Sequence, residues 1–130
     1  MIVVDASVMA PALADDATDG DRARERLQGE RLAAPELFDL EVVAVIRKAL
    51  FAGLLDERRA AIAVADLADL DLQRVSHQPL VARIWELRAN LTPYDAAYVA
   101  LAEMTEATLV TADRRLAQAP GPRCQIEYLG

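Results

Sequence analysis

Cysteine and histidine are almost absent from this sequence, which contains one of each among 130 residues. The single cysteine, Cys124, excludes an internal disulfide bond and a cysteine-rich metal site. The single histidine, His77, precedes Pro79 in a loop, with no partner for catalysis or metal binding visible in the sequence. We therefore interpret His77 as a structural residue.

Long hydrophobic segments are also absent. The longest apolar stretches, such as 42–46, are far too short to span a bilayer, and the N-terminus lacks the basic and apolar regions of a signal peptide. We expect a soluble, cytoplasmic protein.

Basic residues are outnumbered by acidic ones, 14 to 21, which leaves a net charge of -7. This balance argues against a surface that binds nucleic acid indiscriminately through its phosphates. A phosphate-containing substrate would need a metal ion or a local basic patch. The length and the 54% hydrophobic content are sufficient for one domain with a core and short for two, so we assign residues 1–130 to a single domain.

The chain begins with a pattern typical of a buried strand that ends on a carboxylate. Residues 2–4 form a β-branched run without alternation, as in a parallel strand covered on both faces. Asp5 follows at the carboxyl end of this strand, where open α/β sheets build their sites, and Ser7 is placed to cap the next helix. Taken alone, the pair is also consistent with a turn aspartate and a capping serine.

A second carboxylate lies within an unusually apolar helix. Pro35 suits the first helical position, and the helix is predicted to continue to about Ala52, with Gly53 as its terminator. Glu41 interrupts a run that has almost no polar face, and burying its charge is costly without compensation. The alternative is that Glu41 reaches solvent or pairs with one of two basic neighbours, Arg47 or Lys48.

Two further carboxylates follow in the second half of the chain. Thr92 and Pro93 predict a helix start, with Asp95 at the third helical position, where it could instead complete a capping box. Residues 108–111 predict another buried strand, and Asp113 follows two residues after its end.

The rest of the chain alternates between strand and helix patterns. We predict helices at 8–14, from Thr18 or Asp19 to about 28, at 56–70 with Asp56 as cap, and at 79–89, and strands at 31–34, 71–75 and 124–129. In the helix at 79–89, we assign the apolar residues, Val81 and Trp85 among them, mainly to the core.

The four carboxylates are predicted to converge. In a parallel sheet with right-handed crossovers, the carboxyl ends of strands and the amino ends of helices lie on the same edge. Mutual repulsion would raise the pKa values of these carboxyl groups unless a cation lay among them, and oxygen-only ligands suit Mg²⁺ or Mn²⁺. Such a site is suited to phosphoryl chemistry.

Four segments carry a resemblance to a known family. Val3–Ser7, Leu37–Val43, Thr92–Tyr98 and Val110–Leu116 resemble, in order and spacing, the four acidic motifs of PIN-domain ribonucleases. Length and ending are similar especially to the VapC toxins of bacterial toxin–antitoxin pairs, and the resemblance covers nearly the whole chain.

The resemblance implies a three-layer α/β/α fold with a mainly parallel sheet and a metal-dependent endoribonuclease. Asp5, Glu41, Asp95 and Asp113 would hold one or two Mg²⁺ or Mn²⁺ ions, and a metal-activated water would attack the RNA. Ser7 and Thr111 match hydroxyl positions near that site, where they would orient a carboxylate or a water. Basic candidates for contact with RNA phosphates, which are also candidates for ordinary surface charges, are Arg114, Arg115, Arg47 and Lys48.

The same resemblance implies partners. Such toxins form homodimers and bind a VapB-like antitoxin, whose tail occupies the active-site groove and often places an arginine among the acids. Their substrates are particular tRNAs or ribosomal RNA.

Two alternatives remain at this stage. A haloacid-dehalogenase-like phosphatase also begins with a strand that ends in aspartate, but Ser7 stands where its second aspartate belongs and no later catalytic lysine motif is apparent. A PIN fold that only binds RNA or a partner is the other, and the intact acidic quartet argues against it.

Overall fold

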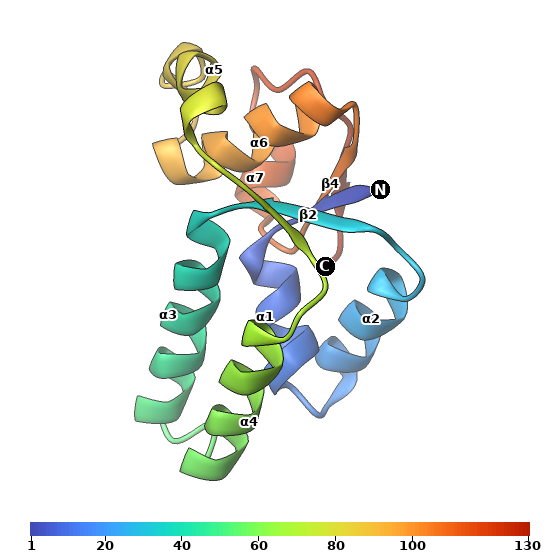
Figure 1. Ribbon diagram of the computed structural model, residues 1–130, viewed down its shortest axis with the longest axis vertical. Helices are drawn as coiled ribbons and strands as arrows, with labels where there is room; N and C mark the ends of the chain where they lie inside the picture. Colours follow the sequence, from blue (N-terminus) through green and yellow to red (C-terminus); the bar gives the residue numbers. More distant parts are fainter.

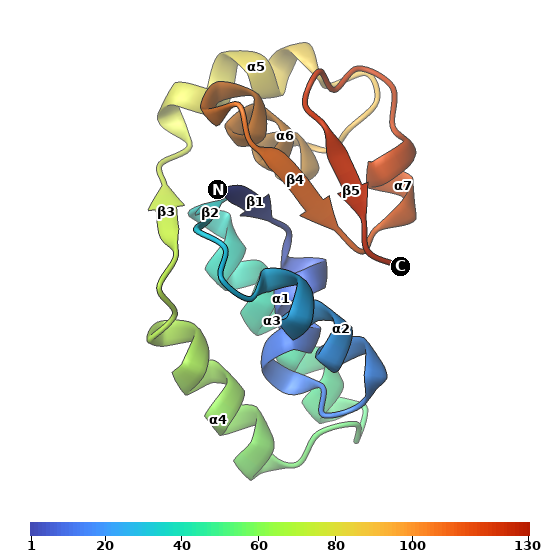
Figure 2. The same cartoon turned by 90° about the vertical axis from the view of Figure 1, so that its right-hand side faces the viewer.

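The computed structural model describes all 130 residues and is built around a five-stranded sheet in which every strand pair is parallel. The strand order is β3-β2-β1-β4-β5 (Figures 1 and 2). The strands are β1 (Ile2–Val4), β2 (Leu32–Pro35), β3 (Gln73–Val75), β4 (Thr108–Thr111) and β5 (Ile126–Tyr128). The predicted parallel sheet is confirmed.

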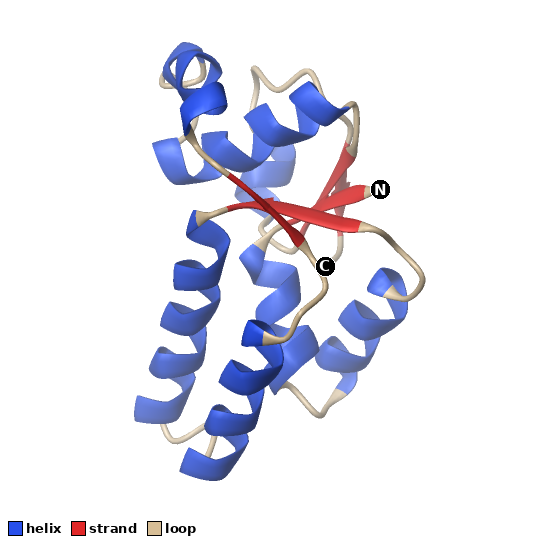
Figure 3. Ribbon diagram, viewed as in Figure 1, coloured by secondary structure: helices blue, strands red, loops and turns tan.

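Helices cover both faces of this sheet (Figure 3). They are α1 (Ala6–Ala14), α2 (Thr18–Leu27), α3 (Leu37–Phe51), α4 (Glu57–Ala68), α5 (Val81–Glu86), α6 (Pro93–Thr105) and α7 (Arg114–Gln118), with a short 3₁₀ turn, η1 (Gln78–Leu80), before α5. Figure 1 shows α1 to α4 on one side of the sheet and α5 and α6 on the other. The three-layer α/β/α prediction is therefore confirmed.

The chain reverses its direction across the sheet between β1 and β4. β2 and β3 are added successively on one side of β1, and the chain then crosses to the other side of β1, where it forms β4 and β5. Ligand sites of open α/β sheets lie at the carboxyl edge beside such a reversal. Val3 and Val4 have no exposed surface, as expected for a central strand covered on both faces.

The start of α3 differs from the prediction. Pro35 is the last residue of β2, paired with Val75 of β3, and the helix begins at Leu37. The amide of Glu36 donates to the carbonyl of Val75 (3.0 Å), and the amide of Leu37 donates to Nε2 of His77 (3.1 Å). Strand pairing thus overrides the local preference of proline for a helix start. The interpretation of His77 as structural agrees with its role in capping this helix.

Two predicted caps are also wrong. The helix after β1 begins at Ala6, so Ser7 lies inside its first turn and bonds the side chain of Asp5 instead. The second helix begins at Thr18 without a side-chain cap, and Asp15 accepts the amide of Ala17 in the loop before it. Asp56, by contrast, caps α4 as predicted, accepting the amide of Arg59 at 2.7 Å.

The helix predicted at 79–89 is shorter and less buried than expected. It divides into η1 and the six-residue α5, and Val81 and Trp85 are 57% and 66% exposed. These two residues are four apart and so share one face, whereas α5 packs on α6 through its other face. Their assignment to the core is wrong.

Helix α3 is also less buried than its apolar sequence suggests, because its only buried residues are Phe38, Val42 and Ile46. Leu40 and Phe51 are more than 70% exposed. The helix therefore presents an apolar outer face. No helix in the structure combines the length and apolar character required to cross a membrane.

Candidate active site

The acidic candidates lie at the carboxyl edge of the two central strands and at helix starts beside it. The backbone places Asp5 next to β4, since its amide donates to the carbonyl of Val110 at 3.0 Å. Asp113 follows β4 by two residues and is the N-cap of α7, with Oδ1 accepting the amides of Arg115 (2.9 Å) and Leu116 (3.4 Å).

Asp5 is buried and held by two hydroxyl groups. Ser7 Oγ donates to Asp5 Oδ2 at 2.6 Å, and Thr111 Oγ1 donates to the same oxygen at 2.8 Å. Each hydroxyl oxygen also accepts a backbone amide, that of Ala112 (2.9 Å) for Ser7 and that of Asp113 (3.0 Å) for Thr111. Because an ionised carboxylate can only accept, both hydroxyl groups supply the protons of these bonds, and Oδ1 has no side-chain donor.

Glu41 is half-buried on α3 and pairs with a residue that the sequence analysis did not single out. The hydroxyl of Tyr98, on α6, donates to Glu41 Oε1 at 2.6 Å. Neither Arg47 nor Lys48 pairs with Glu41, so the predicted pairing with a basic neighbour is wrong, while Glu41 remains partly exposed to solvent. Arg47 instead lies over the ring of Phe51, 4.7 Å from its centroid.

Asp95 occupies the third position of α6, as predicted. Its amide donates to Thr92 Oγ1 (3.2 Å), but no reciprocal side-chain bond completes a capping box. Its carboxylate lies 3.3 Å from Arg115 Nη2, which is also 3.5 Å from Asp113. A guanidinium group therefore bridges two of the acidic candidates.

Burial and mutual repulsion shift the titration of this cluster. Burial is the main cause that raises the pKa of Asp5, and the charge of Asp113 raises it further. The hydrogen bonds from Ser7 and Thr111 lower this pKa but do not cancel the effect of burial. Burial, and then the charges of Asp5 and Asp95, raise the pKa of Glu41, while the Tyr98 bond opposes the shift. Burial and the charge of Asp5 likewise raise the pKa of Asp95. The carboxylates are thus close enough to repel one another, which a cation would relieve.

The donor chemistry fits a hard divalent ion, because only carboxylate and hydroxyl oxygens are present. No three of these side chains converge tightly enough to hold one ion as they stand. Ligation would require carboxylates to rotate and Arg115 to leave Asp95, which its exposed side chain permits.

Comparison with known proteins identifies the family to which this chain belongs. The PIN domain profile matches residues 2–122. The chain is 38% identical over 129 residues to Ribonuclease VapC12 of Mycobacterium tuberculosis, an alignment that covers 99% of each protein. It is 42% identical over 132 residues to the VapC ribonuclease Mb0985 of Mycobacterium bovis, covering 97% of this chain and 96% of that relative. This chain belongs to the PIN-domain family of VapC ribonucleases.

The fold agrees with that of solved PIN-domain structures. The structure of VapBC2 from Rickettsia felis, bound to a DNA fragment from their promoter, superimposes with a TM-score of 0.69 over 98% of both chains at 16% identity. Within this PIN domain, only one of the four basic candidates, Arg115, contacts the acidic residues. Arg114 instead lies over the ring of Tyr128, 5.3 Å from its centroid, and Lys48 makes no ion pair.

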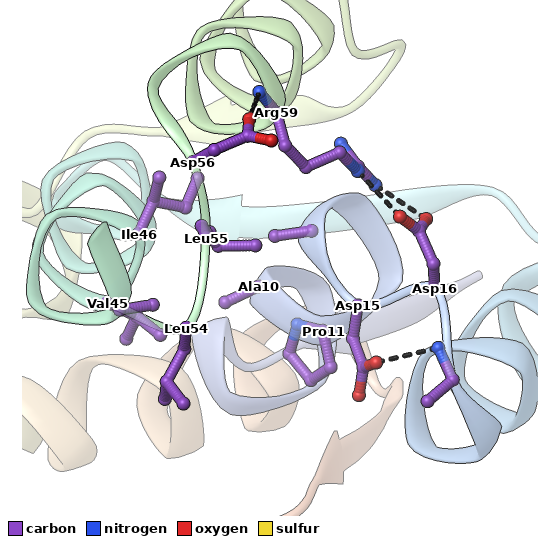
Figure 4. A pocket seen from close by; sticks show the side chains of 13 residues that line it. Ala10, Pro11, Asp15, Asp16, Val45, Ile46, Leu54, Leu55, Asp56 and Arg59 are labelled. Atoms are coloured by element: carbon purple, nitrogen blue, oxygen red, sulfur yellow. Dashed lines mark hydrogen bonds and ion pairs between the residues drawn. The ribbon is translucent and has the colours of Figure 1, made fainter. Parts of the chain in front are cut away.

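A second feature of this PIN domain is an apolar pocket outside the acidic cluster. It has a volume of about 770 Å³ and lies between the end of α1, the second half of α3 and the loop that leads into α4 (Figure 4). Its apolar floor includes Pro11, Ile46 and Leu55, and Asp15 and Asp16 lie on its rim. None of the four acidic candidates lines it.

Tyr98 is the site residue that sequence reasoning missed. One signal was available, because Tyr98 lies three residues after Asp95 on a predicted helix and so shares its face. Its polar partner, Glu41, is 57 residues away in the chain, and no local pattern connects the two.

Proposed function

We propose that this chain is the toxin of a toxin–antitoxin pair, a Mg²⁺- or Mn²⁺-dependent endoribonuclease that hydrolyses RNA phosphodiester bonds with a metal-activated water. The observation that carries the proposal is the cluster of mutually repelling carboxylates at the reversal point of the sheet. Relatives aligned over nearly their full length are named as VapC ribonucleases, which supports the activity. Membership of the PIN-domain family removes the support for a haloacid-dehalogenase-like phosphatase.

Asp5, Glu41 and Asp95 would hold the ion. Asp113 would be a further ligand through Oδ2, because its Oδ1 already accepts backbone amides as the cap of α7. When bound, the ion supplies a water of lowered pKa and stabilises the departing oxygen. Ser7 and Thr111 both donate to one oxygen of Asp5, and no side chain donates to the other. We expect 5′-phosphate and 3′-hydroxyl products, from a tRNA or ribosomal RNA.

The basic side chains would contact the RNA. Arg115 neutralises Asp95 and Asp113 in the metal-free arrangement, and on release it would reach a phosphate of the substrate. Arg114, Arg47 and Lys48 are exposed, make no ion pair with the acidic residues, and remain proposed contacts.

The proposed partners are a VapB-like antitoxin and a second copy of the chain. The placement of Arg115 supports an antitoxin arginine among the acids, because a guanidinium fits between Asp95 and Asp113. The apolar pocket of Figure 4, whose rim carries an ion pair between Arg59 and Asp16, suits an apolar segment of the same partner. Homodimer formation is proposed from the family, and the exposed apolar face of α3 would supply surface for it.

The test compares wild type, Asp5→Asn and Asp66→Asn on total cellular RNA, with Mg²⁺, Mn²⁺ or EDTA, followed by sequencing of new 5′ ends. Asp66 is an exposed α4 residue without an ion pair, so its variant is the matched control for loss of a carboxylate. We expect discrete cleavage by wild type and Asp66→Asn, and none with EDTA or with Asp5→Asn.

Equal cleavage by all three proteins would identify a contaminant. Binding of RNA or of a basic partner without cleavage by any of them would favour the binding-protein alternative. Cleavage that persists in EDTA and disappears only in Asp5→Asn would contradict the metal requirement.

A further inference from the structure

The bond between Tyr98 and Glu41 joins the two faces of the sheet at the acidic cluster. Glu41 belongs to α3, and Tyr98 belongs to α6 on the opposite side. Tyr98 has no exposed surface, and its hydroxyl lies 2.6 Å from Glu41 Oε1, the length of a short charge-assisted hydrogen bond.

Glu41 has no other hydrogen-bond donor. Its carboxylate is half-buried on an apolar helix, and the basic residues nearest in sequence do not contact it. Without the phenol, the carboxylate would be free to rotate between the cluster and solvent. With the phenol on Oε1, the other oxygen, Oε2, is left without a donor, as Oδ1 of Asp5 is.

Helix α6 also carries Asp95, one turn before Tyr98. A single rigid element therefore sets both the position of one acidic side chain and, through the phenol, that of another. Because Tyr98 is packed in the core, movement of its ring is restricted.

We propose that Tyr98 is a positioning residue that orients the Glu41 carboxylate for binding of the divalent ion, so that α6 aligns Glu41 with Asp95. The inference rests on the proposed metal-dependent function. Hydrogen-bonding partners of metal ligands typically contribute 10- to 100-fold to metal affinity.

The test measures Mn²⁺ binding to the full chain by the electron paramagnetic resonance signal of free Mn²⁺, for wild type, Tyr98→Phe and Tyr94→Phe. Tyr94 is exposed, lies on the same helix and makes no hydrogen bond, so its variant is the control for loss of a phenolic hydroxyl. We expect about 10- to 100-fold weaker binding for Tyr98→Phe and affinity within about twofold of wild type for Tyr94→Phe.

A double variant separates positioning from general loss of structure. In a Glu41→Gln background, Tyr98→Phe should cause little further loss of affinity, because its effect passes through the Glu41 carboxylate. Circular dichroism of the metal-free proteins checks that each variant is folded.

Each result decides between the two proposals. Unchanged Mn²⁺ affinity in Tyr98→Phe, or the same loss in the Glu41→Gln background as in wild type, would overturn the positioning role and leave the proposed function intact. Absence of Mn²⁺ binding by the wild-type protein would overturn both.

Discussion

Replacement of Thr111 by valine tests whether the hydroxyl network around Asp5 stabilises the fold as the structure indicates. Thr111 has no exposed surface, and valine has nearly the same shape, so no cavity should form. The substitution removes the donor to Asp5 and the acceptor of the Asp113 amide.

The expected cost follows from these two bonds. A hydrogen bond to a charged group contributes about 1.5–3 kcal/mol, and the amide left without a partner at a half-buried position costs about 1 kcal/mol more. The higher strand propensity of valine offsets only a few tenths of this. We therefore expect the free energy of unfolding to fall by about 2–3.5 kcal/mol, a large share of the roughly 5–15 kcal/mol that is typical of a domain.

The assay is urea unfolding at pH 8 in EDTA, followed by circular dichroism. With a slope of about 1.5 kcal/mol per M, the midpoint should fall by about 2 M. Thr108→Val is the matched control, because Thr108 begins the same strand, is half-buried and makes no side-chain hydrogen bond. Equal midpoints for the two variants would refute the reasoning.

Other predictions concern charge. Because burial raises the pKa of Asp5 in the folded state above its ordinary value of 3.8, this group favours folding at low pH, and the contribution is lost as the pH rises through the folded pKa. Asp5→Asn should therefore raise the urea midpoint of the metal-free protein at pH 8 and flatten its decline with rising pH; a lower midpoint at pH 8 would contradict this. Glu103 accepts from Arg83 (2.7 Å) and from the amide of Arg123 (2.8 Å). Glu103→Ala should lower the free energy of unfolding, measured in urea, by about 2–4 kcal/mol. A decrease below about 0.5 kcal/mol would show that these two bonds to Glu103 contribute little to stability. Arg115→Ala should strengthen Mn²⁺ binding several-fold and weaken RNA cleavage, since the guanidinium competes for Asp95; equal Mn²⁺ affinity would argue against that competition.

The sequence predicted helix starts correctly where a capping residue or a proline acts on residues in the same helical turn. Thr92, Pro93 and Asp56 act within one helical turn, and the structure places these helix starts as expected. Pro35 shows the limit of such reasoning, because pairing with a strand 40 residues later decided its conformation. The resemblance to PIN domains identified the family, while the metal-binding roles of the acidic residues remain proposals.

The candidate site was predictable in part for the same reason. Asp5, Glu41, Asp95 and Asp113 follow strands or lie near helix starts, and parallel topology brings such positions to one edge. The fine geometry was not predictable, because it depends on residues far apart in sequence. Thr111 reaches Asp5 across 106 residues, and it donates to the same carboxylate oxygen as Ser7.

The sequence by itself determined the alternation of strands and helices, the parallel sheet and the carboxylates at its edge, because hydrophobic period and helix-start residues act locally. Only the tertiary structure decided that Tyr98 holds Glu41, that Arg115 bridges Asp95 and Asp113, and that the outer face of α3 stays exposed. Hydrogen bonds and burial depend on which surfaces meet, and the residues of these contacts lie 20 to 57 positions apart in the chain or on elements that only the fold brings together.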